Sequence, residues 1–154
     1  MNKLPLNTKD NIRHNSILKK TASRICATQV LYGASFVEGD IDLVIKSYTD
    51  NYLPSLLIEL GIKDIDTNLF NSITNGVYKN ILRIDDIISK HLSEKWSLNR
   101  LSETEKSVLR LATYELCFDK KFKRIIIINE YISIIESFGG NPNFANGILE
   151  NIST

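Results

Sequence analysis

Apolar residues recur every three or four positions along most of this chain, which is the pattern of amphipathic helices. A first helix is predicted from Ser16, a suitable N-cap, to about Val37, because its apolar and small residues share one side of a helical wheel. Lys20, Arg24 and Thr28 lie on the opposite side, which we expect to face solvent.

Further helices are predicted on both sides of a connecting segment. Gly39-Asp40 ends the first helix and opens a second over residues 41–53, which Pro54 stops. Residues 54–65 are expected to be a connection with at most one short helical turn. Regular apolar spacing then predicts one long helix from Asp66 or Thr67 to about Leu92, through Leu69, Ile73, Val77, Ile81, Ile84 and Ile88.

The segment 102–118 carries the clearest local signals. It follows a predicted loop over residues 93–101, anchored by Trp96 and Leu98. Ser102-Glu103-Thr104-Glu105 fits a capping box, in which the serine oxygen accepts a backbone N–H and the glutamate reaches back to the serine N–H. The following helix is apolar on almost every side, which is typical of a helix buried at the centre of a bundle.

Four consecutive isoleucines, residues 125–128, favour a strand by propensity, whereas the apolar spacing onward to Phe138 is helical. A helix is predicted, because no other credible strand exists to pair with this one. Residues 139–143 read as a turn, and a last helix is predicted from Phe144 to about Ile152. The sequence therefore indicates an all-α fold of about six to seven helices, forming one domain over residues 16–154.

Charge is distributed unevenly although the net charge of the 154 residues is only +1. Residues 1–24 carry one acid, Asp10, and six basic side chains: Lys3, Lys9, Arg13, Lys19, Lys20 and Arg24. Residues 1–15 are polar and interrupted by Pro5, so a flexible basic tail is predicted there. A basic arm on a mildly acidic body suits either a polyanionic partner or a merely solvated tail. Residues 120–124, KKFKR, form a second basic patch.

Several classes of function lack support. The sequence has none of the GxGxxG, P-loop, GxSxG or HExxH motifs, and Cys26 and Cys117 form no CxxC pair, so no enzyme activity, cofactor or metal site is predicted. Arg110 and Glu115 are read as charges satisfied at the bundle edge or in internal ion pairs rather than as a catalytic pair. No signal peptide or membrane-length apolar run is present, which predicts a cytoplasmic protein without membrane contact.

Three blocks of the sequence are distinctive: RICATQVLY (residues 24–32), WSLNRLSETEKSVLRLATYEL (residues 96–116), and INEYISIIESFGG followed by FANGILE (residues 128–150). In this order they resemble the NusB family of bacterial transcription antitermination factors. The resemblance implies an all-helical fold of two packed bundles. It also implies binding of boxA-type single-stranded RNA together with NusE, a small-subunit ribosomal protein, to help RNA polymerase read through terminators.

The resemblance also implies an RNA-binding surface. The family's arginine-rich first helix corresponds here to Lys19, Lys20 and Arg24, which are the expected phosphate contacts. Tyr32 lies two turns beyond Arg24 on the same stripe, where it can stack on a base or lie at the edge of the core. Three further residues match family positions at or near the RNA surface, with a capping role as the alternative for the first: Glu105, Phe144 and Asn146.

Two other functions remain open. The chain also resembles the RNA-binding part of ribosomal RNA cytosine methyltransferases, although it ends at Thr154 without a cofactor-binding α/β domain, so that interpretation requires a fragment. A helical module that binds only proteins is the third interpretation. A homodimer that hides the RNA surface also remains possible.

Overall fold

The computed structural model describes residues 8–35 and 40–152, with the side chains from residue 14 onward. Within these ranges it contains eight α-helices, a 3-10 turn (η1, Leu98–Arg100) and a π-helical turn (η2, Glu115–Asp119), and no strand. The all-α prediction is confirmed. The helices outnumber the predicted six to seven because one predicted connection is helical and one predicted helix is broken.

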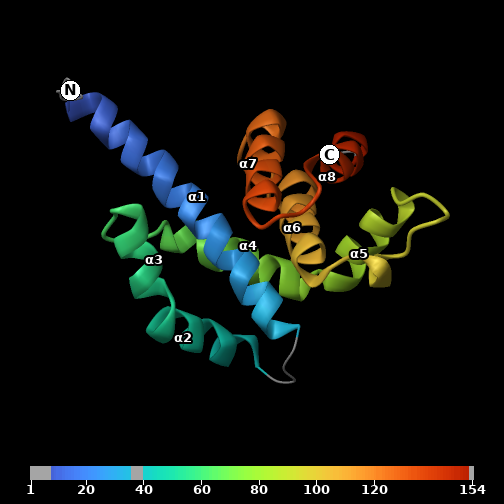
Figure 1. Ribbon diagram of the computed structural model, residues 1–154, viewed down its shortest axis with the longest axis horizontal. Helices are drawn as coiled ribbons and strands as arrows, with labels where there is room; N and C mark the ends of the chain where they lie inside the picture. Colours follow the sequence, from blue (N-terminus) through green and yellow to red (C-terminus); the bar gives the residue numbers. More distant parts are fainter. Residues whose placement is uncertain (1–7, 36–39, 153–154) are drawn as a thin grey trace.

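The helices form two packed groups (Figure 1). The first group comprises α1 (Thr8–Ala34), α2 (Ile41–Asn51), α3 (Leu53–Leu60) and α4 (Thr67–Lys79). The second comprises α5 (Ile81–Lys90), α6 (Glu103–Tyr114), α7 (Arg124–Ser137) and α8 (Pro142–Asn151). Helix α6 lies at the centre of the packing. It contacts α1 and α4 of the first group and α5, α7 and α8 of the second group.

Helix α1 begins earlier than the sequence predicted. It starts at Thr8 rather than Ser16, and no glycine or proline interrupts the chain between Pro5 and Gly33. Its first turns project beyond the other helices (blue in Figure 1). Residues 8–15 of the predicted tail are thus helical, while residues 1–7 and the predicted helix end near residue 37 lie outside the described ranges.

Two further predictions of helix extent were wrong. Pro54 stands in the first turn of α3, where a missing N–H costs nothing, so residues 53–60 are helical rather than a connection. Gly61, with φ of 68°, ends that helix in the left-handed conformation. The long helix predicted over residues 66–92 breaks at Asn80, whose side-chain amide donates to the carbonyl of Gly76 at 2.8 Å. An asparagine amide that bonds to backbone in this way competes with helix continuation.

The predicted central helix is confirmed. Six residues of α6 are buried: Ser107, Val108, Leu109, Leu111, Ala112 and Thr113. Ser102 caps it, since its Oγ accepts the N–H of Glu105 at 3.1 Å, as the capping box predicts. The Glu105 carboxylate, however, accepts the Ser102 hydroxyl at 3.1 Å rather than the serine N–H.

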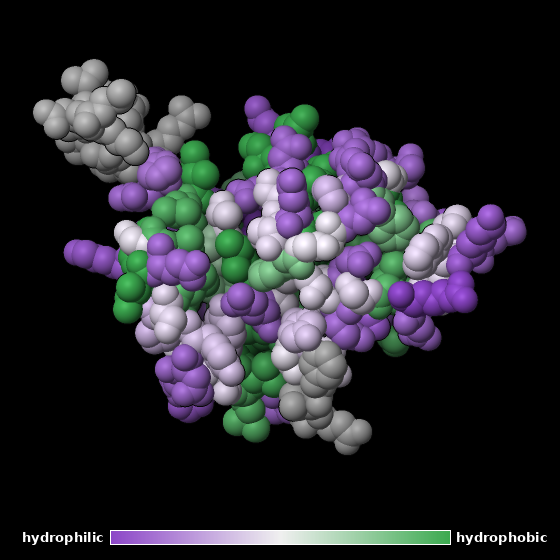
Figure 2. Space-filling view, viewed as in Figure 1, coloured by the Kyte–Doolittle hydropathy of each residue, from purple (hydrophilic) through white to green (hydrophobic). Residues whose placement is uncertain are grey.

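The isoleucine run is helical, as predicted. Ile125 and Ile126 lie in the exposed first turn of α7, whereas Ile127 and Ile128 are buried. Helix α8 begins at Pro142, two residues before the predicted Phe144, with Asn141 as its N-cap. The segment between α5 and α6 exposes the polar residues Glu94, Lys95 and Arg100, and hydrophilic surface gathers at the right of Figure 2, where this segment lies.

Candidate nucleic-acid interface

Arg24 lies in the core, not on the RNA-facing surface that the sequence predicted for it. Its side chain is 1% exposed. Nε and Nη2 donate to the two carboxylate oxygens of Glu115 at 2.9 and 3.0 Å, and Nη1 lies 3.2 Å from Oε1 of Glu130. The expected polar face of α1 is therefore buried at this point. Thr28, on the same stripe, is buried too and donates to the Arg24 carbonyl.

The group around Arg24 is fully paired. The Tyr131 hydroxyl donates to the Glu115 carboxylate, and the Arg24 guanidinium lies 5.0 Å from the centroid of the Phe122 ring. Burial raises the pKa of Tyr131, and the charge of Glu115 raises it further. Burial by itself lowers the pKa of Arg24, but the hydrogen bond and charge of Glu115 reverse this and raise it above its ordinary value. The Arg24 guanidinium thus stays charged inside the fold.

The two lysines of α1 are better placed for phosphates. Lys19 Nζ lies 2.9 Å from Asp64, in a pair whose side chains are 40% and 66% exposed. Lys20 Nζ donates to the Ser16 hydroxyl at 2.8 Å. Exposed pairs of this kind are weak and solvent-screened, so both ammonium groups can turn towards a polyanion.

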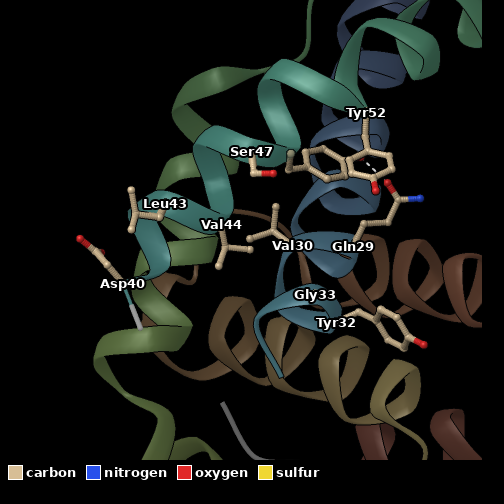
Figure 3. Close-up of a pocket in the computed structure, with 10 residues that line it drawn as sticks. Gln29, Val30, Tyr32, Gly33, Asp40, Leu43, Val44, Ser47 and Tyr52 are labelled. Carbon is tan, nitrogen blue, oxygen red and sulfur yellow. Dashed lines mark hydrogen bonds between the residues drawn. The ribbon is translucent and has the colours of Figure 1, made fainter. Parts of the chain in front are cut away.

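Tyr32 is 44% exposed on the last turn of α1, at the edge of a groove between α1 and α2 (Figure 3). The groove measures about 770 Å³, and its walls include Val30, Leu43 and the stacked rings of Tyr48 and Tyr52. Figure 3 shows the Tyr32 ring pointing away from that stacked pair. Asp40 is the one charged residue among the lining residues, so the groove itself offers phosphate no cation.

Glu105 and Phe144 lie in the first turns of α6 and α8, and Asn146 lies in the second turn of α8. The ring centroid of Phe144 lies 5.7 Å from that of Trp96, a residue that the sequence pattern indicates only as a loop anchor. Trp96 and Asn146 are exposed, while Glu105 and Phe144 are half-buried. The structure thus pairs Phe144 with a second accessible aromatic, the kind of surface on which unstacked bases pack.

The predicted residues do not form one compact site. Lys20 and Tyr32 are twelve positions apart on α1, about 18 Å at the helical rise of 1.5 Å per residue. The basic residues Lys120, Lys121 and Lys123 were noted as a patch in the sequence but were not assigned to the site. All three are exposed.

Other kinds of site find no support in the described part of the chain. No group of His, Cys, Asp and Glu side chains there can hold a metal ion. No helix there is both long and apolar enough to cross a membrane. Neither cysteine is in a disulfide: Cys26 is buried in the core, where burial raises the pKa of its thiol, and Cys117 is half-buried.

Residues 21–154 match the model of the NusB family. The chain belongs to the NusB family. A relative named transcription antitermination protein NusB, from Caulobacter vibrioides, is 30% identical over 141 residues, which cover 90% of this chain and 95% of the relative. The NusB protein of Thermotoga maritima is 49% identical over a shorter stretch of 80 residues, which cover 51% of this chain and 56% of that protein.

A solved structure confirms the NusB fold. It is described as antitermination factors NusB and NusE in complex with dsRNA, and its matching chain superposes with a TM-score of 0.70 at 25% identity. The match covers 87% of this chain and 95% of that one. The family resemblance predicted from the three sequence blocks is therefore confirmed, including the two-bundle architecture.

Proposed function

We propose that this chain is a non-enzymatic RNA-binding adaptor of transcription antitermination. It binds a boxA-type single strand together with a NusE-type small-subunit ribosomal protein and acts in the cytoplasm on elongating RNA polymerase. One observation carries the proposal: most of the chain superposes on a chain of a structure described as antitermination factors NusB and NusE in complex with dsRNA.

The RNA surface we propose consists of Lys19 and Lys20 on α1, Tyr32 at its last turn, and the Trp96–Phe144 pair with Asn146. The lysines supply phosphate contacts, and the aromatic rings supply platforms for unstacked bases. Glu105, which matches a family position linked to the RNA surface, also accepts a hydrogen bond from the Ser102 hydroxyl. Arg24 is excluded from direct phosphate contact, because a move to the surface would leave Glu115 buried without its main partner.

A surface with so few cations explains why a protein partner is needed. Non-specific binding to nucleic acids typically has a Kd of about 10⁻⁴–10⁻⁶ M near physiological salt. The proposed surface has only two lysines on α1, and one of them is paired with Asp64. We therefore expect the isolated chain to bind RNA with a Kd at the weak end of this range. A basic partner docked alongside extends the positive surface and fixes the course of the strand.

The test is fluorescence polarisation with a labelled boxA-like single strand, titrated with the chain alone and with the chain plus a NusE-type protein. A shuffled strand of equal composition is the matched control. The proposal expects tight binding for the boxA-like strand only when both proteins are present. If the chain binds the NusE-type protein but neither strand in any combination, it is a protein-binding module and the RNA-binding proposal fails.

A further inference from the structure

A basic loop joins α6 to α7 and presents three lysines to solvent. This α6–α7 loop comprises Lys120, Lys121, Phe122 and Lys123, between η2 and the first residue of α7. All three lysines are exposed, while Phe122 is half-buried. None of these ammonium groups is within 4.0 Å of a carboxylate among the described residues, unlike that of Lys19. Three accessible cations therefore lie within four positions.

The loop is held against α1. Two cations lie close to the Phe122 ring, with the Arg24 guanidinium 5.0 Å and the Lys121 ammonium 5.7 Å from its centroid. Nearby, Thr21 of α1 donates to the Glu130 carboxylate of α7 at 2.9 Å. The lysines are thus displayed from a packed support, next to the turn of α1 that carries Lys20.

Two acidic side chains near the loop, Glu115 and Glu130, are paired with Arg24 beneath it. Glu115 is fully buried against Arg24, and Glu130 lies 3.2 Å from the same guanidinium with its side chain 18% exposed. One carboxylate oxygen of Asp119 is buried. Arg124, at the end of the loop, donates to the carbonyls of Ile152 and Leu149 at 2.7 and 3.0 Å. Asp119 is half-buried and its buried oxygen has no hydrogen-bond partner, so three exposed lysines stand against one half-buried carboxylate at this loop.

We propose that the α6–α7 loop is a second phosphate-binding surface, which takes the backbone of the same single-stranded RNA after it passes Lys20 on α1. The inference rests on the proposed function and adds a segment of the interface that the family resemblance did not indicate. The loop supplies point charges without base-reading groups, so its contribution is independent of base sequence.

Lys120 can be replaced by glycine without straining the backbone. It has φ of 52°, a left-handed conformation that glycine adopts more easily than lysine. The test variant is therefore Lys120→Gly combined with Lys121→Gln and Lys123→Gln. The matched control replaces three exposed lysines on other helices, Lys46, Lys79 and Lys90, by glutamine and removes the same total charge.

The experiment measures two labelled probes against each variant from 50 to 200 mM salt. The probes are the boxA-like strand with a NusE-type partner and a uridine 15-mer with the chain alone. For both probes, the loop variant is expected to lower affinity at least about tenfold relative to the control. It is also expected to flatten the log–log salt slope by about 2, at roughly 0.7 for each lost contact. Thermal unfolding of both variants shows that they are folded.

Equal losses in the loop and control variants would mean that total charge, not the loop, drives binding, and would overturn the proposal. An unchanged salt slope in the loop variant would also overturn the loop proposal. The proposed adaptor function would not be affected by that result. If the intact chain binds the uridine strand through the loop but shows no preference for the boxA-like strand with its partner, the loop proposal stands and the proposed function fails.

Discussion

Arg24 and Glu115 are 91 positions apart in the chain and meet in the core as a two-pronged ion pair, with Nε to Oε2 at 2.9 Å and Nη2 to Oε1 at 3.0 Å. One residue belongs to α1 and the other to η2, so the pair links the two helical groups. The π-helical turn that carries Glu115 continues directly from α6. Such turns are rare in helices and often occur where a side chain must be presented in a special register.

Breaking this pair should be costly. Arg24→Met leaves the Glu115 carboxylate buried without its cation, which typically costs about 3–5 kcal/mol of unfolding free energy. Urea unfolding measures the loss. Arg110→Met is the control, because Arg110 makes the same kind of bidentate pair with Asp85 but both side chains are more than 20% exposed. A loss for Arg24→Met no larger than that for Arg110→Met would contradict the structural role of Arg24.

A second prediction concerns the contact between α4 and α6. A Cβ on Gly76 would overlap the ring and hydroxyl of Tyr114. Gly76→Ala is therefore expected to destabilise the fold by about 1–3 kcal/mol, the usual range for overpacking, even though alanine favours helix. Adding Tyr114→Leu should recover part of this loss by vacating the space. A Gly76→Ala chain as stable as the unmodified one would show that the two helices are not in close contact here.

Local signals in the sequence predicted most helices, whereas the main error about the site, the burial of Arg24, has a non-local cause. The Ser102 cap, the apolar face of α6 and the spacing in α7 involve neighbours within four residues, so they can be read from the chain. The burial of Arg24 depends on Glu115 in another helix, and no periodicity on α1 reveals that partner. The break at Asn80 is local, yet the apolar pattern continues through it and masks it.

The site was less predictable than the fold. Lys19, Lys20 and Tyr32 lie on the surface of α1 as expected, but Arg24 does not. The pairing of Trp96 with Phe144 joins a loop to a helix 48 positions later, which residue spacing cannot indicate. The lysines of the α6–α7 loop were visible as a charge run, whereas their support by Phe122 against Arg24 required the folded structure.

Asp119 provides a pH-dependent test. Burial raises its pKa, and the nearby charge of Glu115 raises it further. The folded state therefore favours the protonated carboxyl, so stability is greatest below the unfolded pKa of about 4 and is lost as the pH rises through the higher folded value. Asp119→Asn should remove this loss. Its advantage in unfolding free energy should grow as the pH rises from about 4 and then level off.

Urea unfolding at a series of pH values checks this prediction, with Asp86→Asn as the control at an exposed position. The control should show no comparable growth with pH. An advantage of Asp119→Asn that stays constant with pH, or shrinks as the pH rises, would contradict the unfavourable burial of this carboxylate.

Substitutions in the core should reduce stability, whereas substitutions at the proposed interface should mainly reduce RNA affinity. Leu109→Ala, in the buried centre of α6, is expected to cost about 2–5 kcal/mol of stability. Tyr32→Ala should cost less stability but reduce RNA affinity by about 1–3 kcal/mol if a base stacks on the ring. Chemical unfolding and RNA titration of both variants make the comparison. If Tyr32→Ala melts the fold while the folded fraction binds RNA normally, Tyr32 belongs to the core and not to the interface.

The central claim is that RNA and a NusE-type protein bind this chain cooperatively. Linkage requires each ligand to tighten the binding of the other by the same factor. We predict a factor of at least about ten, near 1.4 kcal/mol of coupling. The decisive measurement is a complete cycle by isothermal titration calorimetry, with RNA titrated in the presence and absence of the partner and the partner titrated in the presence and absence of RNA. Two matching factors of about ten or more are the predicted result. Equal RNA affinity with and without the partner would contradict the adaptor mechanism while leaving the NusB fold unaffected.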